Sequence, residues 1–337
     1  MESDARIFVA GHRGLVGSAL VRRLTGEGYK NILTKSHAEL DLTNQAAVRH
    51  FMQESRPDYV LLAAAKVGGI LANDTHPAEF IAENLAIQNN VIHEAWRCGV
   101  KRLLFLGSSC IYPRDCPQPI REAYLLTGPL EPTNRAYAVA KIAGVEMCSA
   151  YNREYGTQYI CAMPTNLYGP GDNYDLANSH VLPALIRKTH EAKQSHASDI
   201  VVWGTGKPRR EFLHSDDAAD ACVFLLNMDD ERLRKLVHAE HAEPPLINIG
   251  CGKDQTIFEL AQLIKDVVGF NGRLRFDSSK PDGTMQKLLD VTLLGALGWH
   301  PKISLRQGIE RTYADFRTRD NAASLQRQTD VLIRNRT

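Results

Sequence analysis

The stretch RIFVAGHRGLVGSALVRRL, residues 6–24, decides the fold of this chain. Its apolar run predicts a strand that ends near residue 11, and an amphipathic stretch from about residue 15 to residue 27 predicts a helix. Between them Gly11, Gly14 and Gly17 stand in a GxxGxxG spacing. Glycines at these positions permit a tight turn and let backbone amides approach a pyrophosphate at the N-terminus of the helix. The order strand, glycine loop, helix therefore predicts a site for a dinucleotide.

The same alternation continues beyond the glycine loop. Apolar runs bounded by turn residues predict strands, and amphipathic stretches between them predict helices, which indicates a parallel sheet covered on both faces. We predict strands near residues 31–36, 58–65, 101–109, 159–169, 199–204 and 246–250, and helices near 43–55 (with Thr43 as its N-cap), 79–98, 133–156 and 256–269.

These elements predict an α/β protein, a Rossmann-type doubly wound parallel sheet with a smaller, mixed α/β substrate-binding lobe. Residues 1–172 are expected to form the NADP-binding Rossmann domain, to which segments 212–227 and 247–250 return. Residues 173–316 are expected to form mainly the substrate-binding lobe. The polar tail, residues 317–337, is expected to be poorly ordered.

Composition narrows the class of protein. Apolar residues make up 44% of the 337 residues, which is enough to bury a full core. Lys plus Arg number 40 and Asp plus Glu 39, so no charge excess indicates nucleic acid or an anionic membrane as partner. The chain has no run of 18 apolar residues and begins with acids where a signal peptide has bases, so we expect a cytoplasmic protein. Its seven cysteines contain no CxxC pair, so neither a metal site nor a disulfide framework is predicted.

The residues after the second predicted strand bear on which dinucleotide is bound. Enzymes that use NAD place an acid near the end of that strand to hold the ribose hydroxyls. Here Lys35 and His37 stand at that place, no acid precedes Glu39, and Arg13 lies inside the glycine loop. A positive pocket suits the additional phosphate of NADP, so we predict NADP(H) as the cofactor. The alternative is that Lys35 and His37 are ordinary solvated residues.

The segment YAVAK places Tyr137 and Lys141 four residues apart in a predicted helix, on one face. A phenol has an ordinary pKa of about 10 and is a poor acid–base catalyst at neutral pH. A neighbouring ammonium is expected to lower that pKa. Together with Ser108 at the end of the fourth strand, the pair is suited to bind a carbonyl, protonate its oxygen and anchor a nicotinamide ribose. By itself the YxxxK spacing is also compatible with an exposed pair on a helix.

Cys110 lies in GSSCIYP, residues 107–113, directly after that strand. If the strand continues, Cys110 points to the same side as Ser108 and enters the same pocket. The alternative is a small core residue, which is the usual place of a free cysteine. His180, in ANSHVLP, has the corresponding alternative of capping the helix that follows.

The glycine loop, the serine before IYP, YxxxK and PTNLYGPGDN together resemble the extended short-chain dehydrogenase/reductases. Within them the chain looks like the GDP-L-fucose synthases. The likeness runs to about residue 316 through AGHRGLVGSA, LAAAKVGGI, LGSSCIYP, EPTNRAYAVAKIAG, MPTNLYGPGDNY, NSHVLPALIRK, REFLH and SKPDGT. It implies a dimeric NADPH enzyme that epimerises two carbons of GDP-4-dehydro-6-deoxy-D-mannose and then reduces its ketone. GSSCIYP and NSHV are the specific motifs.

The resemblance also implies residue roles. Ser108, Tyr137 and Lys141 would form the reductase triad, and Cys110 with His180 would form the epimerisation pair. Lys188, Trp203, Arg210, Arg273 and Asp282 would contact the nucleotide-sugar, although Trp203 also fits core packing and Arg210 a solvated surface. The further cofactor contacts would be His12, Leu15, Val16, His37, Asp41, Leu42, Leu106, Gly107, Ser109, Pro164, Asn166, Leu167 and His180. One departure is His37, where the family can carry an arginine for the 2′-phosphate.

Three other functions share part of this pattern. A nucleotide-sugar 4,6-dehydratase would place acid–base carboxylates after Ser108, and SSCIY has none. A 4-epimerase would recycle tightly held NAD. A non-catalytic NADP-binding protein would typically lack Tyr137 or Lys141, and both are present.

Overall fold

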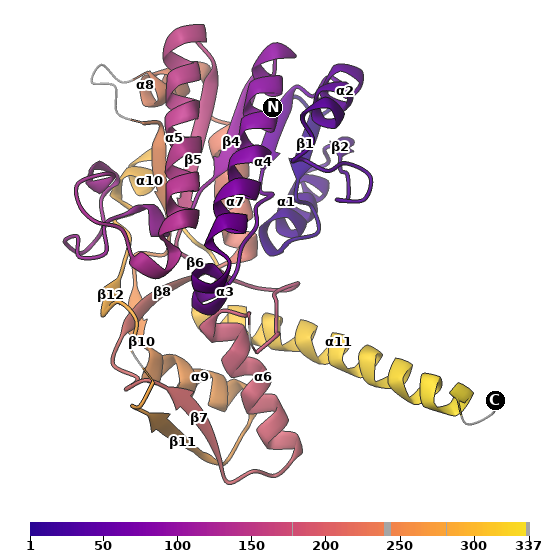
Figure 1. Cartoon of the computed structure of the whole chain (residues 1–337), viewed down its shortest axis with the longest axis vertical. Helices are drawn as coiled ribbons and strands as arrows, with labels where there is room; N and C mark the ends of the chain where they lie inside the picture. Colours follow the sequence, from indigo (N-terminus) through magenta and orange to yellow (C-terminus); the bar gives the residue numbers. More distant parts are fainter. Residues whose placement is uncertain (177, 239–243, 281, 335–337) are drawn as a thin grey trace.

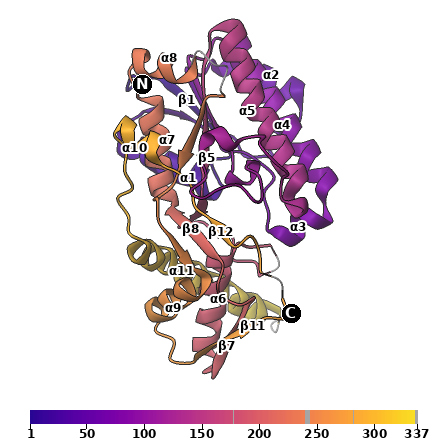
Figure 2. The ribbon, with the colours of Figure 1, turned by 90° about the vertical axis from the view of Figure 1, so that its left-hand side faces the viewer.

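The computed structural model describes residues 1–176, 178–238, 244–280 and 282–334, with side chains as far as residue 320. Figure 1 shows a larger lobe built around a sheet with helices on both faces, and a smaller lobe below it. Figure 2 shows that the chain passes between the lobes several times, because segments from the middle and the end of the sequence lie in both.

A six-stranded parallel sheet forms the centre of the larger lobe, which confirms the α/β class expected from the sequence. The middle strands are buried along their whole length, as their continuous apolar sequences require in a sheet covered on both faces. The strand order reverses between the first and third strands, where ligands of such sheets bind at the carboxyl edge. The strands lie in the order β2 (Asn31–Leu33), β1 (Arg6–Ala10), β3 (Tyr59–Leu62), β4 (Arg102–Leu106), β5 (Gln158–Pro164) and β9 (Leu246–Ile249).

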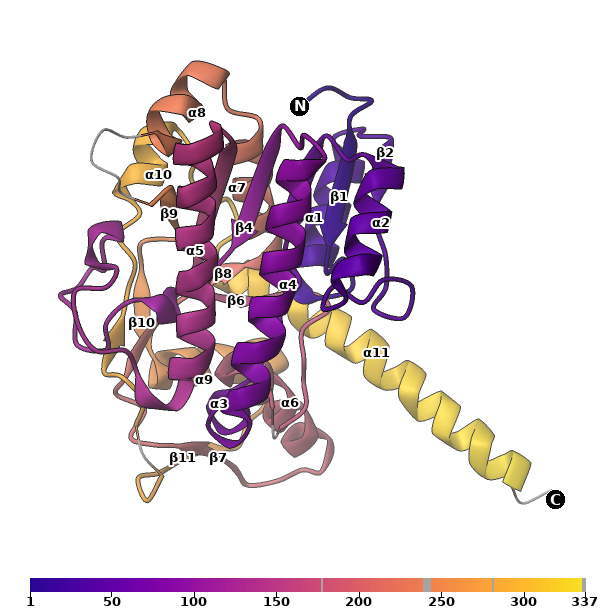
Figure 3. The same ribbon diagram turned by 45° about the horizontal axis from the view of Figure 1, so that its top comes forward.

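Two apolar layers hold helices against the two faces of this sheet. On one face Leu20 and Val223 pack with Val9, and on the other Met52 packs with Phe8. The first layer contains α1 (Leu15–Gly26), α7 (Ser215–Leu226), α8 (Asp230–Val237) and α10 (Thr292–Leu297). The second contains α2 (Gln45–Ser55), α4 (Pro77–Arg97) and α5 (Arg135–Tyr155); α4 and α5 lie side by side in Figure 3, with α3 (Ile70–Thr75) at the end of α4.

The N-cap expected for the second helix was wrong by one residue. The side chain of Asn44 accepts from the amide of Ala47, at 3.1 Å. Thr43 instead donates its amide and hydroxyl to Asp41, at 2.9 and 2.8 Å. Asn is as good an N-cap as Thr or better, so the turn closed by Asp41 leaves the cap to the next residue.

The strand expected at residues 159–169 is two strands that belong to different sheets. β5 ends at Pro164, and the amide of Thr165 still bonds to the carbonyl of Ile249 at 2.9 Å. The next residues form β6 (Asn166–Tyr168), which pairs with β8 (Arg209–His214). The chain thus leaves the central sheet here and enters the second sheet.

The smaller lobe combines short strands with helices. β8 pairs with β10 (Asp254–Thr256) in antiparallel and with β12 (Gln286–Lys287) in parallel orientation, and β7 (Asp199–Trp203) pairs with β11 (Arg273–Asp277). A third apolar cluster joins these strands to α6 (Val181–Gln194), α9 (Ile257–Val268) and α11 (Leu305–Arg334). Three single turns complete the described elements: η1 (Ser109–Ile111), η2 (Glu122–Tyr124) and η3 (Pro132–Asn134).

The polar tail after residue 316 is helical as far as Arg334, and residues 335–337 lie outside the described range. Figure 1 and Figure 3 show this part of α11 extending away from the body of the molecule. No described helix has the length and apolar character needed to cross a membrane.

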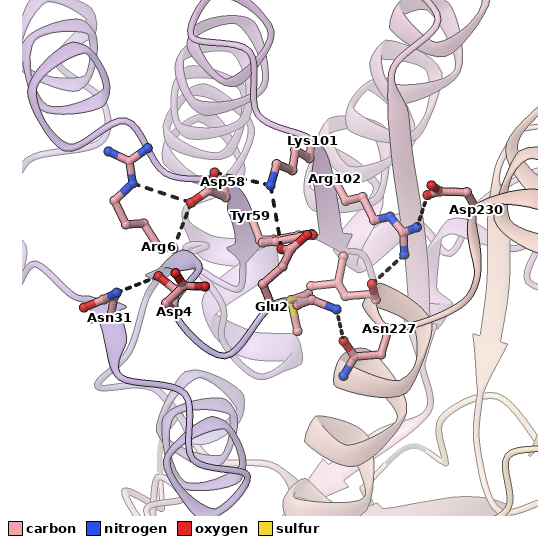
Figure 4. Close-up of polar contacts among 12 residues, drawn as sticks. Glu2, Asp4, Arg6, Asn31, Asp58, Tyr59, Lys101, Arg102, Asn227 and Asp230 are labelled. Carbon is pink, nitrogen blue, oxygen red and sulfur yellow. Dashed lines mark hydrogen bonds and ion pairs between the residues drawn. The ribbon is translucent and has the colours of Figure 1, made fainter.

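Charged side chains close the amino edge of the central sheet, opposite the carboxyl edge (Figure 4). The guanidinium of Arg102 donates to the carbonyls of Leu226 and Met228, at 2.7 and 2.6 Å, and pairs with Asp230. Lys101 lies between Glu2 and Asp58, at 3.7 and 3.6 Å. These groups neutralise one another, so we assign them the structural role of holding this edge of the sheet together.

Candidate active site

The glycine loop leaves the first turn of α1 open to a ligand. Gly11 adopts a φ of 85°, and a Cβ there would lie 2.7 Å from the amide nitrogen of Ala64. A Cβ on Gly17 would lie 2.0 Å from the carbonyl oxygen of Gly11. Gly14 is the N-cap residue and offers no side chain, so the amides at Leu15 and Val16 are not capped by a side-chain oxygen there. This cradle of backbone fits the pyrophosphate of a dinucleotide.

In the loop after β2, the acidic side chains accept hydrogen bonds from neighbouring residues. The amide and hydroxyl of Ser36 both donate to Glu39, at 2.8 and 2.5 Å. Asp41 is held by Thr43 in the same way. By contrast Arg13 is exposed and the side chain of His37 is 84% exposed. The hydrogen bonds from Ser36 and Thr43 lower the pKa values of both carboxyls, so Glu39 and Asp41 keep their negative charge, and Asp41 lies 3.9 Å from the ring of His37. Arg13 is therefore the exposed cation on which the expected 2′-phosphate contact depends.

The remaining predicted cofactor residues gather where strands end. Leu106 is the last residue of β4, and the amide of Gly107 bonds to the carbonyl of Ala162 in β5 at 2.8 Å. Parallel strands present their carboxyl ends at one edge of the sheet, so residues after β1, β4 and β5 line the same edge. The other members there are His12, which is half-buried, the buried Ser109, Pro164 at the end of β5, Asn166 and Leu167 in β6, and Leu42 after the turn.

Lys141 lies buried beneath this edge. Its ammonium donates to the carbonyl oxygen of Leu106 at 2.9 Å and lies 4.7 Å from the ring centre of Phe105. Burial lowers the pKa of Lys141 to about 8, while Cys110 and Cys161 oppose this shift. The ammonium lies 5.8 Å from the ring centre of Tyr137, one helical turn away on α5.

The pKa of Tyr137 corrects an expectation drawn from the YxxxK spacing. Burial raises this pKa, and the nearby Cys110 raises it further, while a hydrogen bond with Ser108 acts in the opposite direction. The expected lowering by Lys141 does not outweigh the effect of burial. A phenol with a raised pKa keeps its proton, so Tyr137 is suited to donate it.

Cys110 does not lie on an extended strand as expected. β4 ends at Leu106, and residues 109–111 form the turn η1, in which the hydroxyl oxygen of Ser108 accepts from the amide of Cys110 at 3.4 Å. The turn still brings Cys110 to Ser108 and Tyr137. Burial raises the pKa of the Cys110 thiol, and the positive charge of Lys287, the hydrogen bond with Ser108 and the charge of Lys141 oppose that shift.

His180 stands directly before α6, on the segment that joins the two lobes. Its side chain makes no capping bond to the helix, which removes the alternative drawn from the sequence. The residue is accessible, yet the surrounding protein desolvates its imidazole and lowers the pKa. Its neighbour Asn178 accepts from the amide of Gly69 at 3.2 Å, so this segment lies against the loop after β3.

Trp203 is the centre of a cationic group in the smaller lobe. It is 64% exposed, so core packing is not its role. The ammonium groups of Lys188 and Lys280 lie 5.1 and 5.5 Å from its ring centre. An exposed aromatic ring with two cations suits a nucleotide, which offers a base for stacking and phosphates for charge.

Arg210 lies on β8, and Asp282 contacts the turn after Trp203. Burial lowers the pKa of the Arg210 guanidinium, and Asp282 acts in the opposite direction. The carboxylate of Asp282 accepts from the amide and hydroxyl of Thr205, at 2.9 and 2.7 Å. Asp282 therefore connects its own loop to the turn after Trp203. Arg209, the sequence neighbour of Arg210, is paired with Asp254 at 2.8 Å.

The structure does not bring Arg273 to Trp203. Arg273 pairs with Asp199 and Trp203 with Asp277, at opposite ends of the two-stranded ladder. The two residues face the same side but stand about 13 Å apart along the strands.

Two lysines were missed by the sequence analysis. Lys280 lies within the quoted motif SKPDGT, which was a usable signal. Lys287 lies seven residues later and is brought beside Arg210 by the pairing of β12 with β8. No local pattern in the sequence announces that contact, because the two strands are far apart along the chain.

Comparisons with known proteins show the family to which the chain belongs. The family model described as the NAD dependent epimerase/dehydratase family matches residues 7–241. The chain is 59% identical over 312 residues to GDP-L-fucose synthase 1 of Arabidopsis thaliana, covering 93% of each chain. It is 53% identical over 316 residues to GDP-L-fucose synthase of Escherichia coli K12, covering 93% of this chain and 97% of that one. A solved GDP-L-fucose synthetase of Naegleria fowleri bound to NADP superimposes with a TM-score of 0.84 at 29% identity, covering 95% and 96% of the two chains.

Proposed function

Because the chain belongs to the NAD dependent epimerase/dehydratase family, we propose that it acts as a GDP-L-fucose synthase, using NADPH to convert GDP-4-dehydro-6-deoxy-D-mannose into GDP-L-fucose. One observation carries this proposal beyond family likeness. Ser108, Cys110, Tyr137 and Lys141 form one group at the carboxyl end of β4, at the same edge of the sheet as the glycine loop. A thiol in contact with a carbonyl-binding pair is what a combined epimerase and reductase requires.

The epimerisation uses the acidity of carbons 3 and 5, which both flank the ketone at carbon 4. Removing either proton sends the electron pair toward the ketone oxygen, where Ser108 and Tyr137 stabilise the enolate by hydrogen bonds. Cys110 takes the proton on one face and His180 returns one on the other, which inverts the centre. Burial lowers the pKa of His180 and so makes its protonated form a stronger acid.

The reduction takes place at the same carbonyl group, which Ser108 and Tyr137 bind. NADPH, when bound by the glycine loop, supplies the hydride for carbon 4. Tyr137, which burial keeps protonated at neutral pH, donates its proton to the oxygen. Lys141 is fixed to the carbonyl of Leu106 and presents its charge to the nicotinamide ribose.

We also propose the division of labour between the lobes. Residues 1–172 with 212–227 and 247–250 would bind the cofactor, and residues 173–316 would bind the GDP-sugar through Lys188, Trp203, Arg210 and Arg273, with Asp282 ordering the loop beside them. The exposed ring of Trp203 under two cations supports this side of the proposal.

The protein is further proposed to be a cytoplasmic homodimer. Fractionation of cells that express the tagged chain tests the location.

The test follows the purified protein with NADPH and the 4-keto sugar in heavy water, by absorbance, mass spectrometry and NMR. We expect NADPH oxidation and GDP-L-fucose with deuterium at carbons 3 and 5. Cys110→Ser should bind NADPH but incorporate little deuterium, because a hydroxyl is far less acidic than a thiol with a pKa of about 8.5. It should slowly release a sugar reduced without inversion.

Tyr137→Phe supplies the complementary variant. It should keep cofactor binding and lose nearly all hydride transfer, since the proton donor is gone. Fully deuterated, fully inverted product from Cys110→Ser at a near wild-type rate would show that the thiol only packs, and would overturn the epimerisation mechanism.

A further inference from the structure

Lys287 lies on a face of the second sheet where positive charge is not neutralised. β12 runs parallel to β8, with Gln286 beside Arg209 and Lys287 beside Arg210. Neighbouring residues of a strand point to opposite faces, and paired residues point to the same face. On one face Arg209 and Gln286 both bond to Asp254, at 2.9 and 2.7 Å. Lys287 and Arg210 share the other face.

That second face holds two cations and, within the described residues, no carboxylate within 4 Å of either. The acids nearby are engaged elsewhere. Glu131 pairs with Arg114 at 3.3 Å, and Asp282 accepts from Thr205. Burial lowers the pKa of the Lys287 ammonium. A desolvated cation without a partner is costly, so an anion is expected to face it in some working state of the protein.

Hydrogen bonds join the strand of Lys287 to residues 118–120, which lie on the segment that follows Cys110. Immediately after Lys287, the carbonyl of Leu288 accepts from the amide of Ile120 at 2.7 Å, and its amide donates to the side chain of Gln118 at 2.9 Å. The strand containing Lys287 is thus paired with the part of this segment that lies eight to ten residues after Cys110. Figure 2 shows β12 beside β8.

The charged and polar groups near Cys110 and Lys287 come from several elements. Cys110 is faced by Lys287 from β12, Lys141 from α5 and the hydroxyl of Ser108, and it acts in turn on Tyr137. Lys287 is faced by Cys110, Arg210 from β8, Cys116 and Glu131, with Cys110 the strongest of them. Lys141 already donates to the carbonyl of Leu106. Within the described residues the ammonium of Lys287 has no hydrogen-bond acceptor, which leaves it free for the sulfur.

We propose that Lys287 is a positioning residue for the epimerisation, whose ammonium stabilises the negative charge that the sulfur of Cys110 carries in its thiolate form. The inference rests on the proposed function, in which Cys110 is the base. The thiolate forms an S–H bond as the C–H bond at carbon 3 or 5 breaks, and the electron pair moves to the ketone oxygen. Lys287 keeps its own proton throughout and acts only through its charge.

The test measures alkylation of Cys110 by iodoacetamide as a function of pH in the full-length protein without substrate. Only the thiolate displaces iodide, so the rate reports the thiolate fraction. Peptide mass spectrometry separates Cys110 from Cys116 and the other cysteines. Removing the charge in Lys287→Met should raise the pKa of Cys110, moving the profile by about one pH unit upward and slowing alkylation about tenfold at lower pH. Lys287→Arg should retain the wild-type profile.

Lys207→Met is the matched control, because Lys207 is an exposed lysine just before β8. It should leave the profile unchanged. Melting temperature and NADPH binding show whether each variant is folded, and Lys287→Gln replaces Lys287→Met if the latter is not. An unchanged profile at Cys110 in the Lys287 variants overturns the proposal, also when affinity for the GDP-sugar falls, since Lys287 would then serve only the diphosphate.

Failure of the role proposed for Lys287 can be distinguished from failure of the proposed function. If the heavy-water experiment shows that Cys110 is not the base while the alkylation profile still moves, the mechanism of epimerisation fails and the contact between Lys287 and the thiolate stands. If deuterium exchange depends on Cys110 but its profile does not depend on Lys287, only the role of Lys287 is wrong.

Discussion

Tyr137 and Lys141 stand four residues apart on α5, yet burial moves their pKa values in opposite directions. The cause is the same for both, because each group is less well solvated in its charged form inside the protein than in water. The phenol therefore keeps its proton at neutral pH, and the ammonium, with a pKa of about 8, keeps most of its charge. The pair is prepared to donate a proton rather than to remove one.

The proposed preference for NADPH is expected to depend on a single residue, Arg13. We predict that Arg13→Ala weakens NADPH binding and leaves NADH binding nearly unchanged. A charge-assisted contact to the 2′-phosphate contributes about 1.5–3 kcal/mol, which corresponds to a roughly 10- to 150-fold loss of affinity. Fluorescence titration with both cofactors measures it. Equal losses of affinity for NADPH and NADH would show that Arg13 does not contact the 2′-phosphate.

Helix α5 carries a half-exposed apolar stripe on its outer side. Val139 and Tyr155 are 39% and 45% exposed, and between them Ala143, Met147 and Tyr151 follow at four-residue spacing and are partly exposed. Residues four apart lie on one face of a helix. The adjoining helix α4 adds Trp96, stacked on Tyr155 at 4.3 Å. A stripe of this length on two packed helices supports the proposed homodimer interface.

We predict that Ala143→Arg converts the dimer to a monomer, because the change places a charged side chain in the middle of this stripe. Light scattering after gel filtration should give a mass near the 37.5 kDa of one chain, against twice that for the wild type. Ala47→Arg, at another half-exposed alanine on α2, should remain dimeric. A wild-type protein that is monomeric at micromolar concentration would refute the interface.

At the scale of the whole molecule, the stability of the fold is expected to depend on pH through His214, which lies where β8 meets α7. The Nδ1 atom of His214 accepts from the amide of Asp216 at 3.2 Å and so caps α7. The ring is buried against Tyr168, and burial lowers the pKa of His214 to about 4, although Asp216 opposes the shift. Protonation at Nδ1 would remove the cap and place a charge in the core.

Stability is therefore expected to fall on acidification. Between pH 6.5 and about 4 the unfolded chain binds a proton that the folded His214 does not, so the free energy of unfolding decreases as pH falls. The loss from this group should be about 2 kcal/mol between pH 7 and pH 5. His214→Asn keeps an oxygen for the cap but does not titrate, so its urea-unfolding free energy should change less over this interval. Parallel pH profiles for the two proteins would assign the acid sensitivity to other groups.

The sequence by itself determined the parts of this protein that depend on local pattern. The glycine spacing at Gly11, Gly14 and Gly17 and the continuous apolar strands predict the parallel sheet, because glycine sterics and the periodicity of burial are properties of short segments. The four-residue spacing of Tyr137 and Lys141 likewise places both on one face of a helix. The family was already apparent from these motifs.

Only the tertiary structure decided the charge states and the distant contacts. The direction of the pKa of Tyr137 depends on how deeply the fold buries it, which its neighbours in sequence do not reveal. The acids Glu39 and Asp41 were visible in the sequence, but their engagement by Ser36 and Thr43 was not. Lys287 faces the segment of Cys110 because a two-residue strand pairs with β8, and such long-range pairing is set by packing of the whole chain. The chemistry of this site therefore rests on contacts between residues far apart in sequence.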